Sequence, residues 1–456
     1  MATNGGPAGS FRWFTLATLA ICLGSGNMNI ACFAPLLQQI STEMRIGMSS
    51  TVSFMSMIYL ASAVAFIFFA GQLVDRIGVK RTMILGTAVS GLAAALMPFA
   101  ASAYSMILAL RLIQGAAMAV AFVCLAPSLR AYFAQKEYGL TGALMGGAMS
   151  LFASLALLLT PIVFHSIGKW PVTVVLFSIP SWIGITLMLF IPSVPSPSKE
   201  KRPTSPGRRD DIGYFQVFKY PITWLGMGAL CFSVCTLRSM ESLAPTYLSS
   251  PVPMGVGLGD IAAGRFTSAL TMAGLLGIIV GGLFLDRVAH GNYRIVMMAG
   301  LALSAVFLYL LTLPVIFTNY ALLMISVVFA GMGVPFVKAC GGPFTINVYP
   351  PHLIGRISGL MTGIGSIAAA AGIELAGQIA ERTGRFSSVM VLLALCGAAG
   401  CILSFFLKPE LRVTATRASR RPPVFAEPNA GGRPIAPKKA GQDFSAQRAS
   451  GNQKAD

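Results

Sequence analysis

One short charged stretch lies between long apolar runs and reads Gly71-Gln-Leu-Val-Asp75-Arg76-Ile-Gly78-Val-Lys80-Arg81. The apolar runs on either side are about 20 residues long, the length that crosses a bilayer core as a helix. A weaker copy stands in the second half as Gly282-Leu-Phe-Leu-Asp286-Arg287, followed by Gly291 and Arg294. A charged turn that recurs between apolar helices predicts two copies of one membrane unit.

The composition excludes an ordinary soluble domain. The chain has 456 residues, of which 55% are hydrophobic and 11% charged, whereas soluble domains average about 25% charged residues. Only helices and closed barrels satisfy their backbone in lipid, and these runs are too long for barrel strands. We therefore expect an all-α membrane protein with twelve transmembrane helices in two pseudo-symmetric six-helix bundles.

The apolar runs set the expected order of the chain. They predict spans at about 11–36, 50–71, 82–100, 104–130, 139–164, 171–191, 221–247, 261–285, 293–313, 319–342, 355–380 and 386–407. The expected parts are a disordered N-terminus 1–10, a first bundle 11–191, a Pro- and Lys-rich cytoplasmic linker 192–219, a second bundle 220–407 and a disordered basic tail 408–456.

The formal net charge of +18 could suggest nucleic-acid binding, but the distribution of the charged residues does not. Basic residues gather after Lys408 and in alternate loops, which is typical of membrane orientation rather than of nucleic-acid binding. Twelve spans place both termini on the side with the more basic loops. The positive-inside rule therefore predicts cytoplasmic termini in a multi-pass protein, which we expect in a bacterial inner membrane, surrounded by lipid.

The sequence has few residues in the arrangements that catalytic and metal-binding sites need. All eight cysteines lie in apolar runs and are interpreted as small apolar filler. The three histidines lie near span ends, and no Ser/His pair, paired carboxylates or metal cluster occurs at a functional spacing. We expect neither enzymatic activity nor a cofactor.

The two halves can be superposed in sequence. Asp75 corresponds to Asp286, and Pro35 near the end of the first span corresponds to Pro245 in the seventh. Such repeats joined by a long linker are typical of carriers that hold substrate between the halves and expose it alternately to each side.

These motifs resemble the major facilitator superfamily over residues 11–407. The charged stretch lies where the family keeps such a loop, and Arg111-Leu-Ile-Gln114-Gly115 is similar to its Arg-x-x-Gln-Gly motif. Lys136-Glu-Tyr-Gly139 and Gly355-Arg356 look like its sequences at the start of spans five and eleven. The resemblance implies a transporter and says little about its substrate.

Two departures from the pattern of the family's drug antiporters argue against a drug-efflux function. Proton-coupled drug antiporters of the family carry a Gly-Pro-rich motif in span five, whereas here the first proline of that span is Pro161. Many of them also place an Asp in span one, where this chain has Asn27 and Asn29.

The resemblance implies that the charged stretch acts as a conformational latch. Its expected members are Gly71, Asp75, Arg76, Gly78 and Arg81, with Asp286 and Arg287 from the second copy. An anion beside a helix N-terminus is favoured, and its charge-assisted bonds can break and reform as the halves move. The alternative is a charged turn that only sets topology.

Arg111 lies within span four, where a charge costs at least about 2.5 kcal/mol and is a functional candidate by default. It could contact substrate or help to couple protons, with Gln114 and Tyr59 adding hydrogen bonds. The alternative is a structural arginine bonded to neighbouring carbonyl groups.

Arg238 is the strongest candidate for substrate contact. It lies seven residues before Pro245, as Met28, between Asn27 and Asn29, lies seven before Pro35. In the family these two spans line the central cavity. Glu241 lies three residues after Arg238, so the two can meet on one helix face. Glu241 is a candidate for proton coupling, and the alternative is a self-neutralised pair that serves packing.

Two further charges lie inside spans. Lys338 in span ten either contacts substrate in the cavity or reaches to the interface. Glu374 in span eleven could carry a proton, and the alternatives are a partner for Arg238 or a group at the rim. The intramembrane charges have a small positive excess, which favours an anionic substrate.

We therefore expect a monomeric secondary carrier that moves a small organic or inorganic anion by alternating access, with a proton as the coupling ion. One alternative is a drug or metabolite exporter. Another is a non-transporting membrane sensor or assembly factor whose basic tail contacts anionic lipid or a partner.

Overall fold

The computed structural model describes residues 9–134, 137–193, 214–350 and 353–407, and these form helices and short connections without a strand. The expectations for most of the N-terminus, most of the linker and the tail fall outside the described residues. The helices are α1 (Gly9–Ala31), η1 (Ala34–Leu36), α2 (Leu37–Met44), α3 (Met48–Phe68), α4 (Ala70–Ile77), α5 (Val79–Ala95), α6 (Met97–Ala100), α7 (Tyr104–Val123), α8 (Leu125–Tyr132), α9 (Tyr138–Ile167), α10 (Trp170–Phe177), α11 (Ile179–Leu189), η4 (Tyr214–Lys219), α12 (Pro221–Ser249), α13 (Asp260–Arg287), α14 (Tyr293–Leu310), α15 (Pro314–Phe317), α16 (Tyr320–Val348), α17 (Ile354–Thr383) and α18 (Ser387–Phe405).

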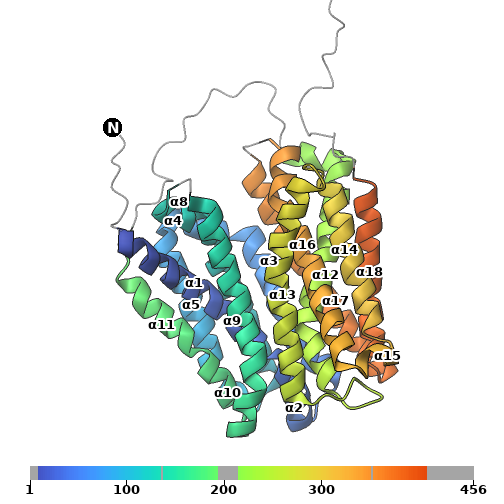
Figure 1. The fold of residues 1–456 in the computed structure, drawn as a ribbon. Helices are drawn as coiled ribbons and strands as arrows, with labels where there is room; N and C mark the ends of the chain where they lie inside the picture. Colours follow the sequence, from blue (N-terminus) through green and yellow to red (C-terminus); the bar gives the residue numbers. More distant parts are fainter. Residues whose placement is uncertain (1–8, 135–136, 194–213, 351–352, 408–456) are drawn as a thin grey trace, which may run out of the picture. The chain divides into compact units, whose positions relative to one another are not determined.

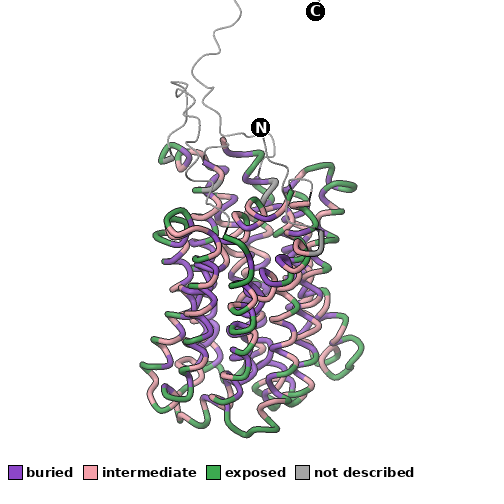
Figure 2. The backbone as a smooth tube through the Cα atoms, turned by 90° about the vertical axis from the view of Figure 1, so that its left-hand side faces the viewer, coloured by how far each residue is buried: buried purple, intermediate pink, exposed green. Residues whose placement is uncertain are grey.

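The helices have the length and surface of membrane spans. Within the described residues, eleven helical segments are long and apolar enough to cross a membrane. The twelfth expected span is α5 followed by α6, which break at Leu96 before Pro98. Many large apolar side chains, such as Phe99 and Phe190, are exposed, as expected for groups that face lipid tails rather than water. Buried residues run along the helices while the connections at both ends are mostly exposed (Figure 2).

The same packing pattern occurs twice. In the first half α1 packs against α9 and α11, and α7 against α3 and α5, while α5 packs against α11. In the second half α12 packs against α17 and α18, and α16 against α13 and α14, while α14 packs against α18. Each of these five contacts of the first half has its counterpart in the second, so the structure confirms two pseudo-symmetric bundles (Figure 1).

Two helix pairs join the halves, α3 with α17 and α9 with α13. These pairs are also equivalent under the repeat, because α3 corresponds to α13 and α9 to α17. Ser154 on α9 and Ser268 on α13 share a hydrogen bond of 2.6 Å between their hydroxyl oxygens. The remaining space between the halves is where a substrate site would lie.

Glycine permits the closest approaches inside each half. A Cβ on Gly115 of α7 would lie 2.7 Å from the Cα of Ile58 on α3. The equivalent Gly331 of α16 would place a Cβ 3.1 Å from the Cα of Leu270 on α13. Both glycines lie eleven residues after the tyrosine that begins their helix, so the glycine of the Arg-x-x-Gln-Gly motif serves helix packing.

The charged stretch is more helical than a hairpin turn. Residues Ala70–Ile77 form α4, and only Gly78, with φ 84°, separates it from α5. Asp286 lies in the last turn of α13, with the reversal at His290 and Gly291, which have φ 47° and 80°. The sequence therefore located both reversals, but it placed the aspartates in the turns rather than at the ends of helices.

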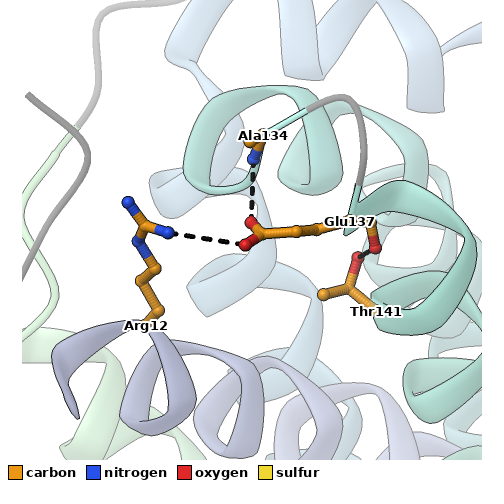
Figure 3. A network of polar contacts seen from close by, with 4 residues as sticks. All are labelled: Arg12, Ala134, Glu137 and Thr141. Carbon is orange, nitrogen blue, oxygen red and sulfur yellow. Dashed lines mark hydrogen bonds and ion pairs between the residues drawn. The ribbon is translucent and has the colours of Figure 1, made fainter. Parts of the chain in front are cut away.

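We call the end of the bundle where α1 begins the terminal end, and the opposite one, which holds α2, α10 and α15, the far end (Figure 1). At the terminal end Arg12 Nη1 lies 3.4 Å from Glu137 Oε1, and the amide of Ala134 donates to Glu137 Oε2 at 3.2 Å (Figure 3). Lys80 Nζ donates to the carbonyl oxygens of Leu189 and Ile191 at 3.0 and 2.5 Å. These contacts hold the terminal end of the first half together.

Candidate functional site

The space between the halves holds a charged pair under an aromatic ring. Arg238 Nη1 donates to Glu241 Oε2 at 2.8 Å, one turn along α12. The guanidinium carbon of Arg238 lies 5.6 Å from the ring centroid of Tyr59 on α3 in the other half, within the range of a cation–π contact. The pair is partly exposed, with 22% and 24% of the two side chains accessible.

A cavity of about 30 Å³ adjoins this pair. Its lining comes from both halves and consists of Asn27, Ile30, Ala31, Met55, Tyr59, Ala153, Leu157, Arg238, Glu241, Ser242 and Thr271. Pockets that hold organic ligands usually have about 300 Å³ or more, so in this conformation the cavity has room only for water-sized occupants. A larger ligand requires the helices to move.

Two lining residues, Ser242 and Thr271, escaped the sequence reasoning because they are uncharged and common in apolar helices. Ser242 lies four residues after Arg238 on α12, and that spacing places it on the same helix face. This spacing could have identified Ser242. Thr271 lies on α13, and only the packing of α13 brings it to the cavity.

Lys338 on α16 extends the charged group. Its side chain is exposed, and it interacts electrostatically with Arg238 and Glu241. This electrostatic interaction agrees with the placement beside the central site, but Lys338 is not among the residues that line the cavity. The group then holds two cations and one anion, with a net positive charge.

Arg111 is placed differently from Arg238. Its side chain is fully buried inside the first half, and its Nε donates to the carbonyl oxygen of Phe54 at 3.2 Å. Its Nη1 donates to Gln114 Oε1 at 2.6 Å and to the carbonyl oxygen of Asn29 at 3.5 Å. The guanidinium carbon lies 4.1 Å from the ring centroid of Phe33. This geometry favours the structural alternative.

Asn29 and Gln114 accompany Arg111 inside the first half. Asn29 Nδ2 donates to Ser181 Oγ at 3.0 Å, and both side chains are fully buried. Neither Asn29 nor Gln114 lines the central cavity, whereas Asn27 does. The two neighbouring asparagines of span one therefore point to different environments, as the helical period requires.

Glu374 joins the two halves. Its carboxylate on α17 accepts hydrogen bonds from Ser53 Oγ, at 3.1 and 2.9 Å to the two oxygens, and from Ser56 Oγ at 3.0 Å. Both serines lie on α3. From the sequence Glu374 was a candidate proton carrier, with a partner for Arg238 or a group at the rim as the alternatives, and these serine partners were not anticipated.

The expected latch residues lie on α4 and near the ends of α5 and α13. Asp75, Arg76, Asp286 and Arg287 are exposed, and within the described residues no hydrogen bond or ion pair links the side chain of Asp75 or Asp286 to another helix. Gly71 is exposed on α4, while Gly78 forms the reversal before Arg81 on α5. The latch therefore stays a prediction.

In the part of the chain that the structure describes, no group of three or more His, Cys, Asp or Glu side chains is placed so that it could hold a metal ion. The eight cysteines are free thiols.

Comparison with known proteins defines the class. The family model of the Major Facilitator Superfamily matches residues 16–373, with a second match over residues 253–448. The chain belongs to this superfamily and is a multi-pass membrane transporter rather than an enzyme.

The curated relatives include two named transporters. The chain is 25% identical over 412 residues to the "Probable sulfoacetate transporter SauU" of Cupriavidus necator, covering 85% of this chain and 90% of the relative. It is 23% identical over 352 residues to the human "Voltage-gated purine nucleotide uniporter SLC17A9", covering 72% of this chain and 77% of the relative.

Solved structures with the same fold include a bacterial homolog of the human lysosomal transporter Spinster, with a TM-score of 0.70 at 14% identity, covering 88% of this chain and 97% of that one. The D-xylose-proton symporter matches with a TM-score of 0.69 at 12% identity, covering 89% and 99%. At these identities the likeness shows the fold alone.

Proposed function

We propose that this transporter is a secondary carrier for a small organic anion, held between the halves by Arg238 and Lys338. The observation that carries the proposal is the Arg238–Glu241 pair beside a cavity that both halves line. Two cations face one carboxylate there, so an anionic group of the substrate meets a net positive charge. Both relatives described above are named for cargo with acidic groups, sulfoacetate and purine nucleotide.

Glu241 gives this site a route to proton coupling. An incoming carboxylate or sulfonate competes with Glu241 for the guanidinium of Arg238, because the two anions need the same donors. Protonation of Glu241 would release Arg238 for the substrate and keep the site near neutrality. A proton would then enter with each anion, which makes the carrier a symporter.

The site requires alternating access, because the cavity of about 30 Å³ cannot hold an organic anion. Rocking of the halves about the α3–α17 and α9–α13 pairs would enlarge it. We place the terminal end in the cytoplasm of a bacterial inner membrane, since the basic loops lie there, and treat the carrier as a monomer. A reporter fused after Asp456 tests the orientation: activity only on the outside would overturn it.

Transport by reconstituted protein tests the function. Proteoliposomes with an inward proton gradient are given sulfoacetate, a C4 dicarboxylate, a purine nucleotide or a neutral sugar. We expect uptake of an acidic compound and loss of uptake in Arg238→Lys, because lysine keeps the charge but lacks the planar fork of donors. Arg265→Lys, at an exposed arginine of α13, is the matched control. Uptake of the sugar alone, unchanged in Arg238→Lys, would refute the anion site.

Glu241→Gln separates the two parts of the proposal. If Glu241 carries the proton, this variant keeps counterflow exchange of the anion but loses stimulation by the proton gradient. Full stimulation in Glu241→Gln would remove Glu241 from the coupling mechanism while leaving the anion site intact.

A further inference from the structure

Several polar contacts between the halves lie towards the far end. Glu374 on α17 accepts from Ser53 and Ser56 on α3. Two turns further along α17, Glu381 Oε2 accepts from the backbone amide of Ser49, in the first turn of α3, at 3.0 Å. The N-terminus of a helix favours such an anion. One face of α17 thus presents two carboxylates to donors of the other half.

A third carboxylate repeats the arrangement on α13. Asp260 Oδ2 accepts from Gln39 Nε2 at 2.8 Å and lies 3.9 Å from His165 Nε2. Gln39 belongs to α2 and His165 to α9, both in the first half. All three carboxylates therefore come from the second half, and their donors come from the first.

We propose that the Glu374 carboxylate, with Ser53 and Ser56, seals the far end of the carrier, and that this end opens only when these bonds between the halves break. Glu381 and Asp260 belong to the same seal. The proposal rests on the proposed function only in that the halves rock, and it assigns no substrate contact to these residues. In the proposed orientation the far end faces outside, so this seal closes the gate through which substrate enters.

The serines have the alternative partners that a reversible seal needs. Ser53 Oγ also lies 3.1 Å from the carbonyl oxygen of Ser49, and Ser56 Oγ lies 3.1 Å from that of Ser53. A hydroxyl group has one proton to donate. While Glu374 is a carboxylate, both protons can point across the interface, and the bonds are charge-assisted. When the halves separate at this end, each serine can donate to its own helix instead.

No charged side chain nearby among the described residues takes the place of Ser53 and Ser56 as a partner of Glu374. On the helices that pack against α17, the charged side chains in the described residues are Arg238, Glu241 and Lys338, and α3 adds the titratable Tyr59. On α17 itself lie Arg356, Glu381 and Arg382. No ion pair within 4.0 Å joins Glu374 to any of these described groups.

Distances between two spin labels test the seal without substrate, so failure here is distinct from failure of the anion site. Labels are attached at Ser166→Cys and Thr318→Cys, exposed positions at the far end of the two halves. At pH 8, Glu374→Gln should raise the open-to-sealed ratio about tenfold, since it removes a charged acceptor of three contacts. Glu43→Gln, which changes an exposed carboxylate on α2, is the matched control and should leave the distances unchanged.

The double variant Ser53→Ala with Ser56→Ala should open the far end as Glu374→Gln does, and combining all three changes should add nothing. This serine variant also carries the test if Glu374→Gln does not fold. Distances in Glu374→Gln and in the serine variant that match Glu43→Gln would overturn the proposal, as would opening by the serine variant alone.

Discussion

The two intramembrane arginines, Arg111 and Arg238, lie in environments that assign them opposite tasks. Arg111 is fully buried and held by two carbonyl oxygens and the Gln114 side chain, with no acidic partner among the described residues. Arg238 has a carboxylate partner, partial exposure and a cavity beside it. A buried arginine whose donors are satisfied by the fold organises that fold, whereas one held by a single exchangeable anion can bind another.

The repeat sharpens this contrast. Arg111 lies seven residues after Tyr104 of α7, and the equivalent position of α16, seven residues after Tyr320, is the buried Val327. Arg238 likewise corresponds to Met28 of α1. Each half therefore has an intramembrane arginine where the other half has an apolar side chain, so Arg111 supports the first half through contacts that have no charged counterpart in the second.

The largest effect is expected on transport by Arg238→Ala. Losing the guanidinium leaves Glu241 without its partner and removes the proposed anion contact, so transport should fall by about 100-fold or more, as for loss of a charged contact worth about 3 kcal/mol. The melting temperature in detergent should stay close to that of the wild type, because the site is partly exposed. Normal transport would make the Arg238–Glu241 pair a packing element.

Arg111→Met should have the opposite effect, with a loss of stability rather than of transport. The change leaves the carbonyl oxygens of Phe54 and Asn29 and the Gln114 amide without their buried donor, which should destabilise the protein by about 3 kcal/mol. Thermal unfolding and the yield of monodisperse protein measure the effect, and the protein that still folds should retain transport. A stable variant without transport would instead assign Arg111 to the mechanism.

Gly115→Ala tests whether the region around Arg111 is structural in the same way. The added methyl group meets the backbone of Ile58, and overpacking of this kind costs about 1–3 kcal/mol. Gly331→Ala is the matched change in the other half and should cost a similar amount. Thermal unfolding compares the two, and a much smaller cost at Gly115 would show that α3 and α7 can separate freely.

The smallest effect is expected at Tyr59. Tyr59→Phe keeps the aromatic face over Arg238, so transport should change by about threefold or less. Tyr59→Leu removes the ring, and the apparent affinity for the anion should fall several-fold more. Equal effects of the two variants would show that the phenolic hydroxyl group, rather than the ring, matters at the central site.

Sequence reasoning succeeded for the spans because lipid constrains them strongly. Apolar runs must form helices to satisfy their backbone groups, and the predicted boundaries of the spans before and after the linker match helices such as α9 and α12 closely. The pairing of Arg238 with Glu241 was also predictable, since it depends only on a spacing of three residues within one helix.

Contacts between helices were not predictable in this way. The partners of Glu374 are Ser53 and Ser56, more than three hundred residues away, and no charge or period in the sequence marks those serines. The helical rotation that turns Arg111 inward and Asn27 towards the cavity is equally invisible in a span that is apolar on every side.

The sequence by itself determined a duplicated set of membrane helices, the location of the reversals and the presence of a few charges inside the spans, because lipid penalises any other arrangement. Only the tertiary structure decided which charges meet. It placed Arg111 among carbonyl groups, Arg238 beside a cavity and Glu374 against the opposite half, because packing between α3, α7, α12 and α17 sets the rotation of each helix and hence the partner of each charge.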